Sequence, residues 1–100
     1  MPAYLYATFD VTDSAAYERY RQQVPAVIAA HGGRFLVRGG ATEVLEGEKR
    51  PEKQPMRQVI LEFPDMAHLK AFYNAPDYGP LIALRQSATQ NVQLLAIEGV

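Results

Sequence analysis

The strongest constraint on the fold is the order in which strand-like and helix-like patterns follow one another along the chain. Residues 4–11 (YLYATFDV) alternate between two sets of side chains, as a strand with one buried face does. Apolar residues then recur from Tyr17 to Ile28 at the i, i+3, i+4 spacing of a helix. Similar patterns predict strands at 34–38, 56–63 and 91–97, and a divided second helix with parts at 66–73 and 80–88.

This β-α-β-β-α-β order predicts an α+β, ferredoxin-like fold with a four-stranded antiparallel sheet and helices on one face. A chain of 100 residues suits a single domain, 1–100, with one hydrophobic core. We also expect a short extra strand at 42–46. The charged, proline-containing loop that follows, 47–55, is predicted to be the most mobile part of the chain.

Proline, glycine and capping residues indicate where the elements begin and end. Thr12 or Asp13 can cap the first helix. Pro25 lies within that helix, where it removes one intrahelical hydrogen bond and crowds the carbonyl four residues earlier, so we expect a kink or a break there. The string HGGRFLVRGG places glycine pairs at 32–33 and 39–40, which we interpret as a helix stop and a strand turn.

Composition excludes several classes of function. Ten basic and eleven acidic residues give a net charge of -1, which does not favour a nucleic acid or an anionic membrane as partner. The chain has no cysteine, so disulfides and cysteine-ligated zinc are excluded. No apolar stretch approaches the length of a membrane span, and residues 1–13 do not resemble a signal peptide, so we expect a cytoplasmic protein.

The face of the sheet without helices is the predicted site of association. Aromatic and aliphatic side chains mix there with arginines and carboxylates. We assign these residues to it: Tyr4, Tyr6, Thr8, Asp10, Arg34, Leu36, Arg38, Gln58, Ile60 and Glu62. Because soluble monomers rarely leave a large apolar patch bare, we expect a second copy of the chain to cover this face in a two-fold homodimer.

Several motifs together resemble a bacterial family, the domain of unknown function 1330. They are HGGRFLVRGG, Glu46-Gly47, Glu62-Phe63-Pro64, Phe72-Tyr73, Pro76-Asp77-Tyr78 and Arg85, and the resemblance covers essentially the whole chain. It implies a place in the dimeric α+β barrel superfamily, in which two ferredoxin-like units pack sheet to sheet. That superfamily includes small monooxygenases, haem-degrading enzymes and muconolactone isomerases, so a small-molecule cavity is expected. The family itself has no assigned reaction.

Arg38 and Glu62 are the first candidates for a functional pair, because buried charges need partners. The pair either fixes strand or dimer register as a structural ion pair, or takes part in chemistry. In the second case Arg38 binds a carboxylate or enolate with its planar guanidinium, and Glu62 is a catalytic acid or base. Arg34 is a weaker ligand-binding candidate beside the glycine turn.

Other candidates are a histidine and two tyrosines. His31 can act as an acid or base near neutral pH, although its place at a helix end also suits a capping role. Tyr6 is expected to bind a ligand from the open face, and Tyr78, in NAPDYGP, is either a gate over a cavity or a packing residue. The chain's two histidines lack metal-binding spacing, and no cofactor motif is present, so we expect neither metal nor cofactor.

Two functions fit these residues. The first is a homodimeric, cofactor-free enzyme, similar to a monooxygenase or isomerase, that acts on a small anionic or enolisable organic molecule in a cavity between sheet and helices. The second is a dimer that binds small molecules or serves as a structural module without catalysis. RNA recognition shares the order of elements but needs stacking aromatic residues on both central strands in a basic field, which this sequence does not provide.

Overall fold

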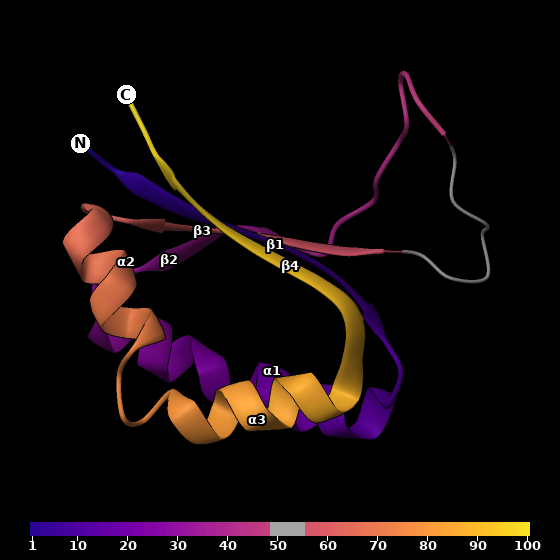
Figure 1. Cartoon of the computed structure of the whole chain (residues 1–100), viewed down its shortest axis with the longest axis horizontal. Coiled ribbons are helices and arrows are strands. Elements are labelled where there is room, and N and C mark those ends of the chain that lie inside the picture. The colour runs from indigo at the N-terminus through magenta and orange to yellow at the C-terminus, as the bar shows by residue number, and fades with distance from the viewer. Residues whose placement is uncertain (49–55) are drawn as a thin grey trace.

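The computed structural model describes residues 1–48 and 56–100, and these form one sheet and three helices (Figure 1). The elements follow the predicted order, with the second helical region divided in two. They are β1 (Ala3–Val11), α1 (Ser14–Ala30), β2 (Arg34–Arg38), β3 (Arg57–Phe63), α2 (Met66–Tyr73), α3 (Gly79–Ala88) and β4 (Thr89–Glu98).

The sheet has the strand order β2-β3-β1-β4, and every neighbouring pair is antiparallel. The helices lie together on one side of it (Figure 1). This is the predicted α+β, ferredoxin-like arrangement, which is therefore confirmed. None of the helices in the described part of the chain is long and apolar enough to span a membrane.

Helix α1 begins where the sequence predicts and runs through its proline. The Asp13 side chain caps the helix by accepting a hydrogen bond from the backbone N–H of Ala16 at 3.1 Å. The helix is continuous from Ser14 to Ala30 with Pro25 inside it, so the alternative of a break is wrong. Gly32 adopts a left-handed φ of 79° just beyond the C-cap His31, which confirms the predicted helix stop.

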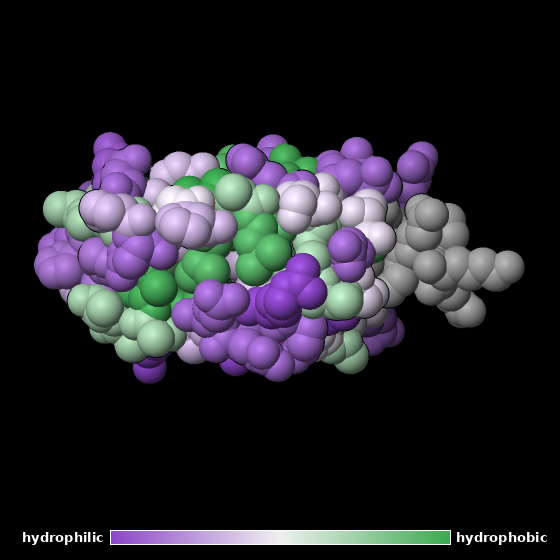
Figure 2. Space-filling view, turned by 90° about the horizontal axis from the view of Figure 1, so that it is seen from below, coloured by the Kyte–Doolittle hydropathy of each residue, from purple (hydrophilic) through white to green (hydrophobic). Residues whose placement is uncertain are grey.

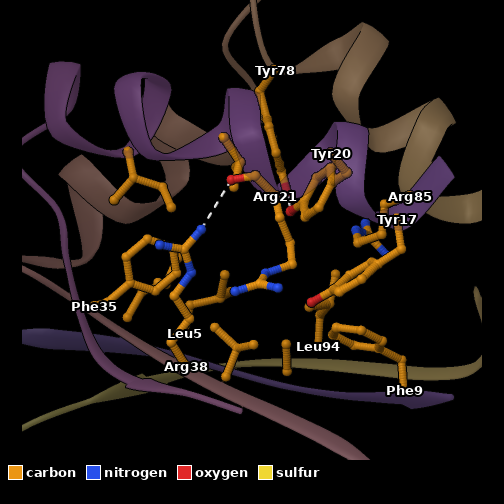
Figure 3. Close-up of a pocket in the computed structure, with 15 residues that line it drawn as sticks. Leu5, Phe9, Tyr17, Tyr20, Arg21, Phe35, Arg38, Tyr78, Arg85 and Leu94 are labelled. Atoms are coloured by element: carbon orange, nitrogen blue, oxygen red, sulfur yellow. Dashed lines mark hydrogen bonds between the residues drawn. The ribbon is translucent and has the colours of Figure 1, made fainter. Parts of the chain in front are cut away.

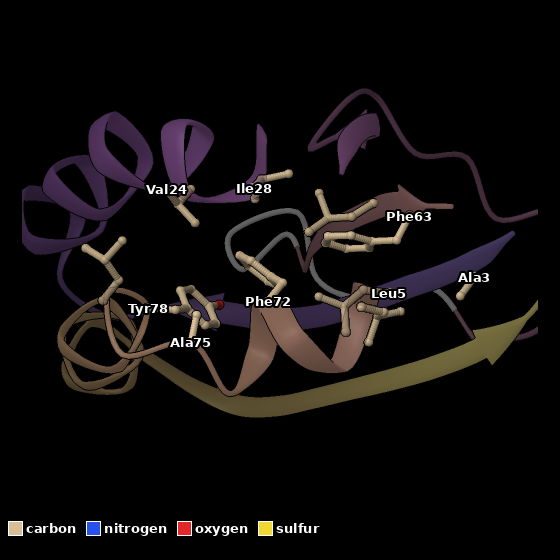
Figure 4. Close-up of a cluster of buried hydrophobic side chains, with 11 residues drawn as sticks. Ala3, Leu5, Val24, Ile28, Phe63, Phe72, Ala75 and Tyr78 are labelled. Carbon is tan, nitrogen blue, oxygen red and sulfur yellow. The ribbon is translucent and has the colours of Figure 1, made fainter. Parts of the chain in front are cut away.

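The hydrophobic core lies between the helices and the inner face of the sheet. Phe63, Phe72 and Tyr78 are its largest fully buried side chains, and they come from β3, from α2 and from the turn before α3 (Figure 4). The ring centroids of Phe72 and Tyr78 are 4.3 Å apart, and those of Phe63 and Phe72 are 5.3 Å apart. Aromatic packing thus ties the divided helical region to the sheet.

A bulge in β2 changes which face its last residues occupy. The pairing of β2 with β3 shifts register between Phe35 and Val37, so Val37 lies opposite Ile60 and Arg38 lies opposite Val59. Arg38 therefore faces the helices and Val37 the open side, and both differ from the predicted assignment. Strict alternation held only as far as Leu36.

The predicted strand at 42–46 is absent. Residues 40–44 have no regular structure and 45–47 form bends, so the chain leaves the sheet after Arg38 (Figure 1). The loop predicted to be mobile lies largely at 49–55, outside the described residues.

Apolar side chains reach the surface on both sides of the layered molecule. Seen from below the view of Figure 1, apolar side chains form a band bordered by polar ones (Figure 2). On the open face of the sheet, large apolar side chains also remain accessible: Val37, Leu95 and Ile97 are 37%, 41% and 48% exposed. The register places Leu95 beside Tyr6 and Ile97 beside Tyr4, so these residues share one surface.

Candidate functional site

A pocket lies between the inner face of the sheet and helices α1 and α3 (Figure 3). The space among its lining atoms, including the open mouth, is about 480 Å³. Its walls are mostly apolar, as is usual for small-molecule sites. The apolar and aromatic part of the lining consists of Leu5, Ala7, Phe9, Tyr17, Tyr20, Val24, Ile28, Phe35, Val59, Leu61, Tyr78 and Leu94.

Three arginines complete the lining, and no carboxylate of the described residues, 1–48 and 56–100, contributes to it. Arg21 comes from α1, Arg38 from the end of β2 and Arg85 from the last turn of α3. Arg38 is exposed, whereas Arg85 is only 3% exposed. The pocket therefore has a strongly positive character, with one cation in its interior and others nearer to solvent. Such a field favours an anionic guest.

Arg85 is the most unusual of these cations. Its Nε is buried and has no hydrogen-bond partner, and no ion pair to its guanidinium occurs within the described ranges. A buried polar group without a partner carries a desolvation cost, and for a charged group the cost is larger. Leu81, Arg85 and Ala88 are the buried residues of α3, at the spacing of one helix face. The fold thus places a cation where a core residue is expected.

The hydroxyl groups of Tyr20 and Tyr78 lie on the same side of the pocket as Arg85. The Oη atoms of Tyr20 and Tyr78 are 2.9 Å apart, so one hydroxyl donates a hydrogen bond to the other. Burial raises the pKa of Tyr20, the neighbouring Tyr78 hydroxyl raises it further, and the positive charge of Arg85 opposes this rise. Because one hydroxyl proton is used in this hydrogen bond, the other O–H proton of the pair is free to bind a guest.

Arg38 sits at the outer part of the pocket and contacts the helix backbone. Its Nη2 donates to the carbonyl oxygen of Arg21 at 2.9 Å, and its guanidinium lies over the Phe35 ring, 4.4 Å from the centroid (Figure 3). The Arg21 carbonyl is the one that would accept from residue 25 in a regular helix, but Pro25 has no N–H. Arg38 replaces the missing donor.

The predicted Arg38–Glu62 pair is wrong, because Glu62 binds the other arginine of β2. Arg34 lies opposite Glu62 in the register, and its Nη2 and Nε lie 2.7 and 2.8 Å from Oε1 of Glu62. Hydrogen bonds from Arg34, and then from the Tyr4 hydroxyl, lower the pKa of the Glu62 carboxyl, against a partial opposing effect of burial. Tyr6, also on this face, donates to Oε1 of Gln58 at 2.5 Å.

The remaining predicted site residues are divided between the pocket and its surroundings. Tyr78 is 2% exposed and lines the pocket as a buried wall residue. His31 is not part of the lining; its Nε2 lies 3.9 Å from Oδ1 of Asp77, and its ring packs edge-on against Phe72. Of the six predicted residues, only Arg38 and Tyr78 come together in the pocket. Tyr6, Arg34 and Glu62 lie on the open face.

Comparison with known protein families assigns residues 2–100 to the domain of unknown function DUF1330. The chain belongs to this family. No curated protein matches it. The family resemblance inferred from HGGRFLVRGG and the accompanying motifs is therefore confirmed.

Solved structures similar to this DUF1330 chain share its fold. One is RPA0582, a protein of unknown function from Rhodopseudomonas palustris, with a TM-score of 0.74, 20% identity and coverage of 99% of this chain and 82% of that one. Another is a mutant of SnoaB, a cofactor-independent oxygenase from Streptomyces nogalater, with a TM-score of 0.70, 13% identity and coverage of 98% and 92%. A dimeric ferredoxin-like protein of unknown function from Jannaschia sp. CCS1 has a TM-score of 0.62, 14% identity and coverage of 99% and 100%.

Sequence reasoning missed the inner part of the pocket. The helical spacing of Tyr17 and Tyr20 predicts core residues, and Arg85 enters the sequence analysis only as part of the family motif. One signal was available: an arginine four residues after Leu81 and three before Ala88 lies on the apolar stripe of its own helix. A charged residue in such a stripe indicates either a buried partner or a ligand site.

Proposed function

We propose that this DUF1330 protein is a homodimer that binds a small anionic or enolisable organic molecule in the pocket of each subunit. The observation that carries the proposal is Arg85, a buried cation at an apolar pocket to which the described part of the chain contributes no carboxylate. An anionic guest supplies the missing counter-charge and recovers part of the cost of burying the guanidinium. The apolar walls accept the rest of the molecule.

Association through the open face of the sheet supports the homodimer. Val37, Leu95 and Ile97 remain exposed there around Tyr4 and Tyr6. A second copy related by a two-fold axis brings the same surface to itself, which is the commonest arrangement of small oligomers. The ferredoxin-like protein from Jannaschia sp. CCS1, which has the same fold, is described as dimeric.

We further propose that the bound molecule reacts without a cofactor. Loss of a proton beside a carbonyl group gives an enolate, whose negative charge a nearby guanidinium stabilises. The enolate then reacts with molecular oxygen or takes up a proton at another carbon, which are oxygenation and isomerisation. The description of SnoaB as a cofactor-independent oxygenase makes the first of these the better supported. Glu62 and His31, the predicted acid–base residues, lie outside the pocket lining, so their catalytic role stays a prediction.

A non-catalytic binding protein is the second candidate, and one observation favours it. Among the described residues, the pocket lining includes no carboxylate and no histidine, and the pKa of Tyr20 is raised, so these residues offer a guest no strong general base. Binding needs only the arginines and the apolar walls.

Ligand extraction followed by a turnover assay tests the proposal. Small molecules released by denaturing the purified protein are identified by mass spectrometry, from the wild type and from Arg85→Met. We expect an organic anion from the wild type and its loss from the variant. Incubating the identified compound with the protein under air and under argon then separates an oxygenase from a binding protein. Recovery of no anion from the wild type, or equal recovery from both proteins, contradicts the proposal.

A further inference from the structure

We infer that Arg85 and the Tyr20–Tyr78 hydroxyl pair form a subsite for one anionic oxygen group, and that the ligand is a small aromatic monocarboxylate or a compound of the same shape. This inference rests on the proposed function and specifies which end of the pocket holds the charge. It assigns the aromatic walls to the body of the ligand and the inner end to its carboxylate.

Arg85 supplies the charged donor. Its Nε is buried without a partner and its side chain lines the pocket. In Figure 3 it projects from α3 towards Tyr17 and Tyr20. A guanidinium presents several N–H groups in one plane, which matches the two oxygens of a carboxylate. A carboxylate in the pocket therefore supplies the counter-charge that this guanidinium lacks among the described residues.

The tyrosine pair supplies a neutral donor beside it. Two hydroxyls that hydrogen-bond to each other use only one of their two protons in that contact, and the second proton is left to donate elsewhere. Arg85 is near enough to Tyr20 for its charge to affect the ionisation of that phenol. A cation and a phenol that both donate towards one place form an oxyanion-binding arrangement.

The aromatic residues of the pocket walls indicate what kind of molecule carries the carboxylate. Five aromatic residues line the pocket, and they come from β1, β2, α1 and the turn before α3: Phe9, Tyr17, Tyr20, Phe35 and Tyr78. Flat rings pack well against such walls, with an offset or edge-to-face geometry. A single charge matches a single buried cation, while Arg21 and Arg38 lie in more exposed positions. These features together favour one carboxylate on a flat apolar body.

Benzoate and its neutral analogue benzamide are suitable probes for the whole protein in a carboxylate-free buffer. In ¹H–¹⁵N spectra the Arg85 Nε–H signal is identified by its loss in Arg85→Lys. We expect millimolar benzoate to move this signal in the wild type, and benzamide to bind about tenfold more weakly because it lacks the charge. Arg19→Lys, which changes an exposed arginine of α1, serves as the matched control and is expected to bind benzoate as the wild type does.

The hydrogen bond between Tyr20 and Tyr78 predicts a distinctive pattern of benzoate affinities among tyrosine variants. Tyr20→Phe or Tyr78→Phe alone leaves one hydroxyl proton free for the ligand, so each is expected to change benzoate affinity little. The double variant removes both protons and is expected to weaken binding about tenfold. Equal, additive losses from the two single variants would overturn the shared-proton arrangement.

The results distinguish this inference from the proposed function. If benzoate binds in the pocket but does not shift the Arg85 Nε–H signal, the assignment of the subsite to Arg85 is wrong. The proposed function of the pocket is not affected by that result. If millimolar benzoate does not bind at all, the inference is also overturned. The proposed function is then judged independently, by the anion released from the purified wild-type protein.

Discussion

Arg38 donates a hydrogen bond to the carbonyl oxygen of Arg21 at 2.9 Å and thereby joins the end of β2 to the middle of α1. The carbonyl is available because Pro25 lacks the N–H that a regular helix would direct to it. A proline that weakens the helix thus creates an acceptor at the edge of the pocket, and an arginine from a different element uses it.

The effect of removing Arg38 is expected to depend on Pro25. In the wild type, Arg38→Met leaves the Arg21 carbonyl without its donor and is expected to lower the free energy of unfolding by about 1 kcal/mol. In a Pro25→Ala background the new backbone N–H of residue 25 can donate to this carbonyl. Arg38→Met is therefore expected to lower the free energy of unfolding clearly less in that background. Urea unfolding of the four proteins at one protein concentration measures the coupling.

Arg34→Met is the matched control for this cycle, because Arg34 lies in the same strand but binds Glu62 on the other face. Its effect is expected to be the same with proline or alanine at position 25. If Arg38→Met destabilises both backgrounds equally, Arg38 does not replace the missing helical donor.

Because the pKa of Glu62 is lowered in the fold, the stability that its carboxylate contributes is expected to be lost at acidic pH. Its pKa is lowered from the ordinary 4.5, chiefly by the hydrogen bond from Arg34. A carboxyl with a lowered folded-state pKa stabilises the fold above its unfolded-state pKa, and this contribution is lost as the pH falls through the folded-state value. The melting temperature of Glu62→Gln is therefore expected to approach that of the wild type as the pH falls below about 4.5.

The control for this titration is Glu43→Gln, which alters an exposed glutamate in the segment after β2. Its difference in melting temperature from the wild type is expected to stay constant over the same range. A Glu62→Gln difference that does not change with pH would mean that the ion pair with Arg34 contributes nothing measurable.

Charge on the open face is expected to separate the dimer. Leu95 is 41% exposed beside Tyr6, so Leu95→Glu places a carboxylate in the proposed interface, where its desolvation opposes association. Sedimentation velocity is expected to show a shift towards monomer, with at least a tenfold weaker dimer if the group is fully desolvated. Ala29→Glu, on an exposed position of α1, is expected to leave the dimer unchanged. Two variants with identical sedimentation would place the interface elsewhere.

Substitution by alanine is expected to change the free energy of unfolding at Gly33, between α1 and β2, but hardly at Gly40, after β2. A Cβ on Gly33 would lie 2.5 Å from a Phe63 ring carbon and 2.9 Å from a methyl carbon of Ile28, whereas one on Gly40 would meet nothing within 4 Å. Gly33→Ala is therefore expected to cost about 1–3 kcal/mol in the free energy of unfolding, through overpacking. Gly40→Ala is expected to be neutral or slightly stabilising. Similar denaturation midpoints for both would refute the close approach at Gly33.

The sequence predicts the arrangement of the elements better than it predicts the site. Strong periodicity and clear caps located β1, α1 and the divided second helix, because these signals are local. The side occupied by Arg38 was not predictable in the same way. It depends on a one-residue shift against β3, and alternation in β2 alone contains no sign of that shift.

Two further differences have equally physical causes. Pro25 is tolerated inside α1, where tertiary contacts, including the bond from Arg38, compensate for the missing N–H. The importance of Arg85 is visible only once the topology brings α3 against α1 and β4, since its burial and its lack of a counter-charge among the described residues are properties of the assembled pocket. Charge pairs between strands are likewise set by register, which is why Glu62 binds Arg34 and not Arg38.

The bulge in β2 lets one short strand place arginine side chains on both faces of the sheet. Because of it, Arg34 faces outward to the neighbouring strand's carboxylate while Arg38, four positions later, faces inward to the pocket on the opposite side of a bend. Substitutions at position 38 can therefore alter the pocket without changing the surface that we propose as the dimer interface. Within one five-residue strand, the proposed ligand preference and the proposed assembly are free to diverge separately.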